Sequence, residues 1–434
     1  MDISVVVIFV GLLVFLAHAF VALFEKTKVP DVLFLILIGL VLGPVLKVVT
    51  PADFGKVGGV FTVIVLVVIL FEGGMQLSLE SLLRTYKQTT KLTLVSYLVA
   101  SVGITLLLHF AAGLSVLTAV FVGAVLAGPG PSVVMPLLKH VPISDSNKTV
   151  LTLESALGEA LTVVIGLGVI RWAAMSSVQL GHMLGGLLSG FLFAAVIGAA
   201  GGYLWSVLLN RVRRLQNAMF TTPSFVFIIY GICELLGFSG PVSALAFGVV
   251  IGNIGDISVP FWKPGKDLEP IRLNSAERAF LAEMVFLLKT FFFVYIGISI
   301  RLQDIATPML AFSVTMTIIL ARIFAVRFSL GKKEASLNDV KFMSVIVPKG
   351  LAAAVLAPLA VASGIAGGAM IQNTIYSVIG LSIILTSVLV FVVHRTSVSL
   401  FVEAFFAGYN GGVSGEEKME KRAASKDDAR RPKK

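Results

Sequence analysis

The sequence predicts an all-α, polytopic membrane protein with about thirteen transmembrane helices. Its composition is 57% hydrophobic and 13% charged, with a mean hydropathy of +0.97, whereas soluble domains are about 45–50% apolar and roughly 25% charged. The chain also divides into apolar runs of about 20 residues, the length that crosses a bilayer. Two of these runs, seven runs apart, are interrupted by proline and glycine, a pattern typical of inverted-repeat membrane folds.

The apolar runs define the expected spans in order along the chain. The first run has only Asp2 as an early charge and is too long for a signal peptide, so we interpret it as a span of the mature protein. The eighth and ninth runs meet at a tight turn signal, Phe238-Ser239-Gly240-Pro241. The predicted spans are 3–23, 31–49, 58–79, 92–112, 114–138, 149–171, 183–209, 220–238, 240–255, 279–300, 305–328, 341–363 and 370–394.

The charges of the predicted loops orient the chain in the membrane. Eighteen Lys and Arg residues fall on one side, and four fall on the other, namely Lys47, Lys56, Arg171 and Arg301. The positive-inside rule places the richer side in the cytoplasm, with the N-terminus outside and the C-terminus inside a plasma or inner membrane. The net charge of +10 therefore indicates membrane topology, and no nucleic-acid partner is expected.

The remaining composition argues against an enzyme. Cys233 is the single cysteine, which excludes an intrachain disulfide and four-cysteine metal sites. The histidines show no metal-ligand spacing, and the sequence contains no Walker or hydrolase motif, so no cofactor is expected. Residues 1–408 are predicted to form one membrane domain, and residues 409–434 a disordered, charged cytoplasmic tail, because that segment has almost no apolar periodicity.

The two interrupted spans are the strongest pointer to a functional site. The fifth contains Gly128-Pro129-Gly130-Pro131, and the twelfth contains Pro348-Lys349-Gly350. Proline removes a backbone donor and disrupts a helix, and unpaired backbone groups at membrane depth are tolerated only within protein or around a wet cavity. Since an offset of seven inverts orientation, spans 1–6 and 8–13 are expected to be inverted repeats with span 7 as connector. The alternative is two unrelated kinks.

Two carboxylates lie within the sixth span. Intramembrane acids are costly and mark functional sites by default. Ser155 and Glu159 are four residues apart and share one helix face, whereas Glu154 is displaced by about 100° from Ser155. We expect Glu159 to bind a proton or a cation in turn, and Glu154 to orient the site. The alternative for either acid is a buried ion pair that only holds helices together.

Buried basic residues are expected to compensate charge. Lys289 lies deep in the tenth span, and Lys349 lies at the break of the twelfth. Lys349 is well placed to neutralise the carbonyl ends of that break, because broken helices direct partial charges at the midplane. Glu72, Glu234 and Arg322 are expected to be structural, with Arg322 reaching toward the membrane surface.

Six short motifs follow one another through almost the whole hydrophobic region, and together they resemble a known family. They are Val29-Pro30 with Leu37-Ile38-Gly39-Leu40-Val41-Leu42-Gly43-Pro44, Leu70-Phe71-Glu72-Gly73-Gly74, Gly123-Ala124-Val125-Leu126-Ala127, Leu153-Glu154-Ser155, Gly237-Phe238-Ser239-Gly240-Pro241 and Phe293-Val294-Tyr295-Ile296-Gly297. The chain resembles the monovalent cation:proton antiporters, most nearly the NhaP-type sodium/proton exchangers.

The chain departs from the family pattern at its centre. The unwound span usually carries Thr-Asp-Pro, but here it reads Pro129-Gly130-Pro131. The ion-binding helix usually carries Asn-Asp or Asp-Asp, but here it reads Gly158-Glu159. Lys349 stands where arginine is common, and Lys289 resembles a lysine of the electrogenic branch although its usual partner position is Gly158.

The resemblance implies an NhaA-like fold of two inverted six-helix repeats that works by alternating access. Spans 4–6 and 11–13 would form a core that moves against a dimerisation scaffold of spans 1–3 and 8–10, with a homodimer as the expected assembly. Glu159 would bind H⁺ or a dehydrated Na⁺ or K⁺, with Li⁺ a further candidate. Carbonyls of Gly128, Pro129 and Gly130 and the hydroxyl of Ser155 would supply neutral oxygens for this alkali cation. Because position 158 carries no acid, electroneutral exchange is expected.

Two other functions remain open at this point. One is a cation channel or gated K⁺ efflux protein of similar core architecture, against which the absence of a C-terminal nucleotide-binding gate argues. The other is a sensor that does not transport.

Overall fold

The computed structural model describes residues 3–27, 30–138, 140–173, 180–213, 218–255, 270–301, 306–332, 334–395, 405–406 and 408–409. Every regular element within these ranges is a helix, which confirms the all-α prediction. Seven of the described helices are long and apolar enough to cross a membrane, and further apolar helices are shorter.

Each predicted span overlaps one helix or one broken pair of helices. The elements are α1 (Ile3–Thr27), α2 (Asp31–Leu40), α3 (Gly55–Gln76), α4 (Leu79–Leu106), α5 (Val116–Ala127), α6 (Pro131–Leu138), α7 (Asp145–Ala173), α8 (Leu180–Val212), α9 (Thr221–Leu235), α10 (Gly240–Asn253), α11 (Ser275–Ser299), α12 (Ala306–Ser329), α13 (Leu337–Val345), α14 (Leu351–Ala362) and α15 (Gly368–Arg395). The number of membrane crossings stays a prediction.

Local sequence explains where several helices begin. Ser78 and Ser115 accept hydrogen bonds from backbone N–H groups in the first turns of α4 and α5. Asn274 and Ser336 form complete capping boxes at the starts of α11 and α13. These side chains satisfy N–H groups that have no partner inside the helix, so each start is fixed by its cap.

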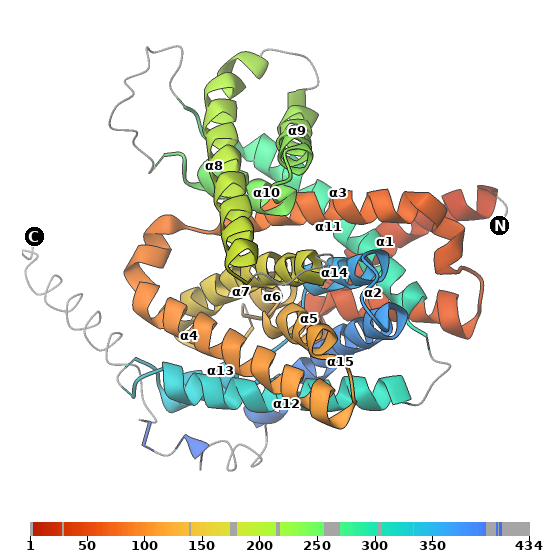
Figure 1. The fold of residues 1–434 in the computed structure, drawn as a ribbon, viewed down its shortest axis with the longest axis vertical. Coiled ribbons are helices and arrows are strands. Elements are labelled where there is room, and N and C mark those ends of the chain that lie inside the picture. The colour runs from red at the N-terminus through yellow and green to blue at the C-terminus, as the bar shows by residue number, and fades with distance from the viewer. Residues whose placement is uncertain are drawn as a thin grey trace, which may run out of the picture.

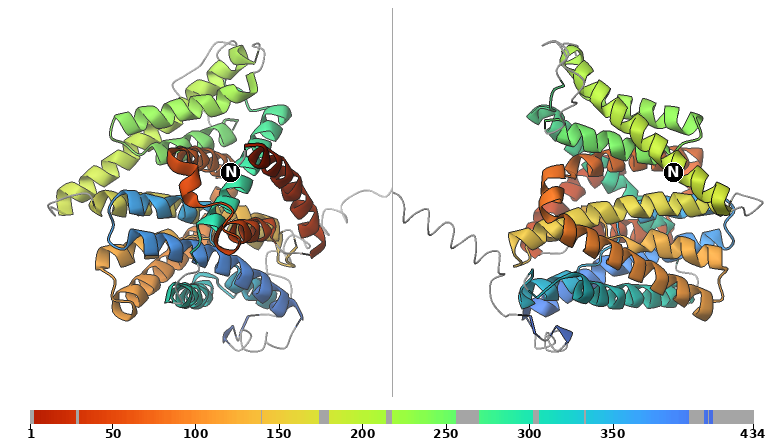
Figure 2. Two further views of the ribbon diagram at one scale, coloured as in Figure 1. Left: turned by 90° about the vertical axis from the view of Figure 1, so that its right-hand side faces the viewer. Right: turned by 60° about the vertical axis from the view of Figure 1, so that its left-hand side comes forward.

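The helices pack as two neighbouring groups (Figures 1 and 2). In one group, α4 packs against α5, α7 and α12, and α14 packs against α15. In the other, α10 lies between α3 and α8, and α2 packs on α11. Figure 1 shows α8, α9 and α10 at one end of the molecule and α4, α12 and α13 at the opposite end. This division supports the predicted core and scaffold, whose functional roles stay predictions.

The two halves of the core share a packing pattern. Helix α4 contacts α5 and α7, and α5 contacts α7. In the second half, α12 contacts α13 and α15, and α14 contacts α15. The inverted repeat stays a prediction, which this shared pattern supports.

A short C-terminal segment packs on the end of α12. The Phe406 side chain is fully buried, and Tyr409 donates a hydrogen bond of 2.6 Å from its hydroxyl to the carbonyl of Leu330. Arg327 of α12 lies 5.7 Å from the centre of the Tyr409 ring. Phe406 and Tyr409 are therefore packed on the core, and residues 410–434 of the predicted tail lie outside the described residues.

Candidate functional site

The two interrupted spans cross at the centre of the core. Helix α5 ends at Ala127 because Gly128 adopts an extended backbone and Pro129 follows it, and α6 begins at Pro131. The second interruption separates α13 from α14 over buried residues 346–350. The backbone N–H of Gly130 donates to the carbonyl of Pro348 at 2.9 Å. One backbone hydrogen bond thus joins the two unwound segments.

Two glycines make this crossing sterically possible. A Cβ atom on Gly130 would lie 2.5 Å from the backbone nitrogen of Gly350, and a Cβ atom on Gly350 would lie 2.5 Å from the Cα of Gly130. Neither separation leaves room for a side chain. In this structure the crossing therefore requires glycine at position 130.

Pro129 and Gly158, two other positions at which the chain departs from the family pattern, lie against each other. A Cβ atom on Gly158 of α7 would lie 2.9 Å from Cδ of Pro129. The proline ring therefore occupies the space beside α7 into which a side chain at position 158 would begin. The substitutions at positions 129 and 158 are complementary in shape.

Glu159 lies directly beside the crossing. Its side chain extends from α7, the residue is 6% exposed, and its Oε1 accepts a hydrogen bond of 3.1 Å from the backbone N–H of Ala352 in the first turn of α14. A helix N-terminus carries partial positive charge and stabilises an anion. A narrow cavity, without room for a water molecule in this structure, adjoins the carboxylate and is lined by both breaks, including Gly128, Gly130 and Gly350.

Thr162, which the sequence analysis did not single out, lines the same cavity. It lies one turn beyond Glu159 on α7, is 2% exposed, and its hydroxyl oxygen has no hydrogen-bond partner. The i,i+3 spacing from Glu159 was the available signal. Ser155 is fully buried and donates to the carbonyl of Thr152 at 2.9 Å, and it is not among the residues that line this cavity.

Lys349 neutralises carbonyl groups, but of the opposite break from the one expected. Its Nζ donates to the carbonyl of Ala127 at 3.0 Å and to that of Gly128 at 3.4 Å. These carbonyls form the C-terminal end of α5, where the helix dipole is negative. The expectation that Lys349 serves its own break was wrong because the two broken spans cross, which brings residue 349 to the end of the other helix.

Arg322 does not reach the membrane surface. Its guanidinium group is buried and donates to both carboxylate oxygens of Glu154, with 2.8 Å for the Nη2 to Oε2 bond. It also donates to Ser96 Oγ at 2.9 Å and to the carbonyl of Met343 at 2.8 Å. The expectation that Arg322 reaches toward the membrane surface was wrong because all these acceptors lie inside the core, whereas its buried contacts agree with the structural role expected for it. Glu154 forms the buried ion pair that was the alternative to orienting the site.

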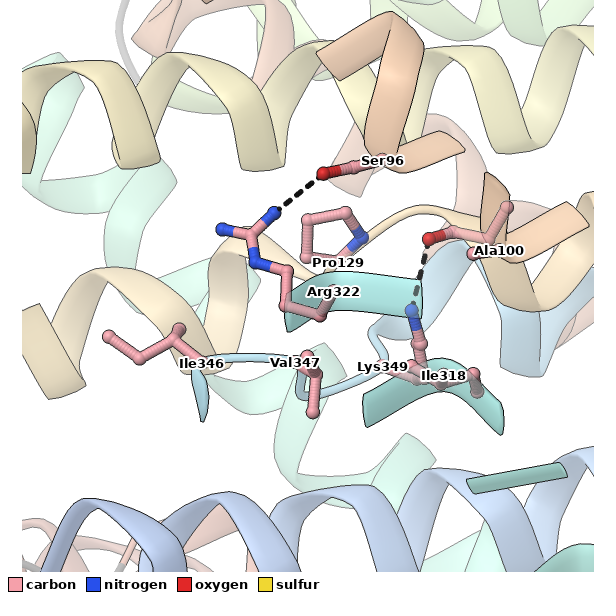
Figure 3. A pocket seen from close by; sticks show the side chains of 9 residues that line it. Ser96, Ala100, Pro129, Ile318, Arg322, Ile346, Val347 and Lys349 are labelled. Carbon is pink, nitrogen blue, oxygen red and sulfur yellow. Dashed lines mark hydrogen bonds between the residues drawn. The ribbon is translucent and has the colours of Figure 1, made fainter. Parts of the chain in front are cut away.

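The same arginine borders a second cavity, of about 20 Å³. Arg322 and Lys349 both line it, and in Figure 3 Pro129 lies between their side chains. Arg322 is paired with the carboxylate of Glu154, whereas Lys349 donates to a backbone carbonyl and has no carboxylate partner.

Lys289 contacts the first break from the scaffold side. It is half-buried, and its Nζ donates to the carbonyl of Ser132 in α6 at 3.1 Å. Glu72 accepts a hydrogen bond of 2.7 Å from the side chain of Gln76, a contact that agrees with the structural role expected for it.

The site around Glu159 combines one buried carboxylate, neutral oxygens and helix ends whose partial charges are compensated by side chains. Glu234, by contrast, accepts a bond of 2.7 Å from the backbone N–H of Gly240 and serves as a cap for α10. Among the described residues, no group of three or more His, Cys, Asp or Glu side chains could hold a metal ion. The carboxylate of Glu159 can hold a proton or offer oxygen ligands to a cation.

A family model and several curated proteins are similar to this chain. The family model "Sodium/hydrogen exchanger, transmembrane" matches residues 11–395. The Na(+)/H(+) antiporter 1 of Methanocaldococcus jannaschii is 22% identical over 374 residues, which are 82% of this chain and 83% of that protein. The K(+)/H(+) antiporter NhaP2 of Shewanella oneidensis is 26% identical over 285 residues, 64% of this chain and 46% of that protein.

A solved structure shows the same fold. The structure of the sodium proton antiporter MjNhaP1 from Methanocaldococcus jannaschii at pH 8 superimposes with a TM-score of 0.69 at 18% identity. The match covers 90% of this chain and 99% of that one.

Proposed function

Because the chain belongs to the transmembrane sodium/hydrogen exchanger family, we propose that it exchanges a monovalent cation for H⁺ across a membrane by alternating access. Relatives named as Na⁺/H⁺ and K⁺/H⁺ antiporters support antiport. The observation that carries the proposal is Glu159, a buried carboxylate that adjoins a cavity between two broken helices. The relatives do not favour a cation channel.

In the proposed cycle, Glu159 holds one ion at a time. As an anion it accepts the Ala352 N–H bond and attracts a cation that has shed its water. Gly128, Pro129 and Gly130 offer backbone carbonyls on the adjoining segment, and Ser155 offers a hydroxyl one turn away on α7. When a proton reaches the carboxylate, its negative charge is lost and the cation leaves. Exchange follows because one carboxylate cannot hold both ions.

In this proposal Lys349 compensates charge and Glu154 positions α7. Lys349 compensates the carbonyl end of α5, which keeps an exposed negative dipole from holding the cation in place. Glu154 fixes α7 to α12 through Arg322, so that Glu159 keeps its position. Lys289 compensates charge from α11, near the carboxylates of Glu72 and Glu159.

The assembly and placement that we propose follow the expected division of the fold. The core of α4–α7 and α12–α15 moves against a scaffold of α1–α3 and α9–α11, and the scaffold carries the homodimer contact. The protein resides in the plasma or inner membrane with its N-terminus outside and its C-terminus in the cytoplasm. The loop charges support this orientation.

The test is cation-driven proton flux in proteoliposomes. Na⁺, K⁺ or Li⁺ is added to vesicles that hold a pH gradient, at external pH values from about 5.5 to 9, a range that spans neutrality and lies above the ordinary pKa of a carboxyl group. We expect the pH gradient to dissipate more than in empty vesicles, and we expect Glu159→Gln to abolish this difference. Antiport is refuted if no cation dissipates the gradient at any pH. Cation flux that proceeds without proton movement would instead indicate a channel.

A further inference from the structure

We infer that the hydroxyl oxygen of Thr162 is a direct ligand of the transported cation, beside the carboxylate of Glu159. This inference rests on the proposed function and names a residue that determines how the cation is bound. Thr162 lines the cavity next to Glu159, and its oxygen is buried and makes no hydrogen bond of normal geometry, with the hydroxyl of Tyr97 close by.

The position of Thr162 directs its oxygen toward the unwound segment. A Cβ atom on Gly128 would lie 2.5 Å from Thr162 Oγ1, so this oxygen closely approaches the break between α5 and α6. Residues three apart on a helix are neighbours on its surface, which places Thr162 and Glu159 on adjoining parts of α7. The hydroxyl therefore lies between the carboxylate-bearing face and the carbonyls of the break.

Two backbone groups of the first break already have partners. The carbonyl of Gly128 accepts from Lys349, and the N–H of Gly130 donates to Pro348. Among the side chains that line the cavity, only Glu159 and Thr162 carry oxygen. A buried hydroxyl without a partner costs free energy unless a ligand satisfies it, and a hydroxyl oxygen offers two lone pairs to a cation.

The chemistry of an alkali cation fits this pair of side chains. A hard monovalent cation that leaves water needs several oxygen ligands, and a single carboxylate supplies only part of the set. Thr162 adds a neutral oxygen without adding charge, so it strengthens cation binding and leaves the proton on Glu159 unaffected. Its loss should weaken the cation side of the exchange selectively.

The decisive variant is Thr162→Val, which removes the oxygen and keeps the shape. In proteoliposomes that show wild-type exchange, the half-saturating cation concentration should rise by about tenfold or more, as expected for the loss of a ligand to a charge. The maximal rate should change less, and Thr162→Ser should restore affinity to within about threefold of wild type. Thr93→Val on α4 is the matched control, because Thr93 is also buried with an unpartnered hydroxyl but does not line the cavity.

A second variant covers the case in which Thr162→Val does not fold. Thr162→Cys places a soft sulfur at the ligand position, and soft ligands favour soft cations. The ratio of half-saturating concentrations for Na⁺ and Tl⁺ should therefore shift toward Tl⁺. An unchanged ratio in Thr162→Cys, or a half-saturating concentration in Thr162→Val equal to that of Thr93→Val, would overturn the inference. Absence of exchange in the wild type would instead refute the proposed function.

Discussion

Replacing Gly130 with alanine should separate the two unwound segments and stop exchange. The added Cβ would lie 2.5 Å from the backbone nitrogen of Gly350. It would lie closer still to the Cα of Gly350. Attractive contacts between heavy atoms lie at about 3.5 Å, so the segments must move apart by at least about 1 Å. That movement also lengthens the 2.9 Å bond from Gly130 to Pro348.

Two costs set the magnitude of this effect. Overpacking of a close-packed interior costs about 1–3 kcal/mol, and loss of a partner for a buried backbone group costs a further 1–3 kcal/mol, approximately. The crossing should therefore be destabilised by about 2–6 kcal/mol. A misplacement of about 1 Å at a reacting site can lower a rate by about a hundredfold, and we expect a loss of exchange of that order.

The assay combines the initial rate of cation-driven proton flux with the unfolding midpoint of the purified protein. Gly380→Ala on α15 is the matched control, because a Cβ there meets nothing within 4 Å and alanine is preferred to glycine inside a helix. The control should retain the wild-type rate and midpoint. A Gly130→Ala protein with wild-type rate and midpoint would refute the steric reasoning.

Three further predictions concern the charged residues. Lys349→Arg should keep substantial exchange, because arginine can also donate to the carbonyl end of α5. Lys349→Ala should lose activity or stability. If both variants lose the same proton flux, lysine itself is required. Glu154→Gln should lower the free energy of unfolding by about 3–5 kcal/mol because it leaves Arg322 buried without its ion-pair partner. The double variant Glu154→Leu with Arg322→Met should recover much of this lost stability in thermal unfolding. A double variant no more stable than the single one would contradict that account. Transport should be electroneutral, so the cation gradient at which proton flux is zero should not depend on the clamped membrane potential. If that gradient does depend on the potential, and the dependence disappears in Lys289→Gln, then Lys289 carries a second charge.

The sequence was sufficient for features that depend on local pattern. Apolar runs mark the helices because lipid requires apolar side chains and internally bonded backbone. Proline and glycine at residues 128–131 and 348–350 mark the breaks because they remove donors and helix preference. Glu159 stands out because an acid inside a span is costly.

Partners between helices could not be predicted in the same way. Arg322 and Glu154 are 168 positions apart, and Lys349 and Ala127 are 222 positions apart. Their pairing depends on how the broken spans cross, which no local periodicity encodes. Thr162 was missed for a related reason, because a threonine in an apolar helix is ordinary and only the crossing leaves its oxygen without a partner.

Charge balance at the crossing links the architecture to the proposed exchange. Each broken helix directs a partial charge at the centre, and each is met by a side chain of opposite sign, Lys349 at the carbonyl end of α5 and Glu159 at the N–H end of α14. The Arg322–Glu154 pair adds no net charge. On the proposed mechanism, Glu159 with either a proton or a monovalent cation has the same net charge, so the centre is equally balanced in both loaded states. The core can then carry either ion across the membrane at a similar electrostatic cost, which is the physical requirement for one-for-one exchange.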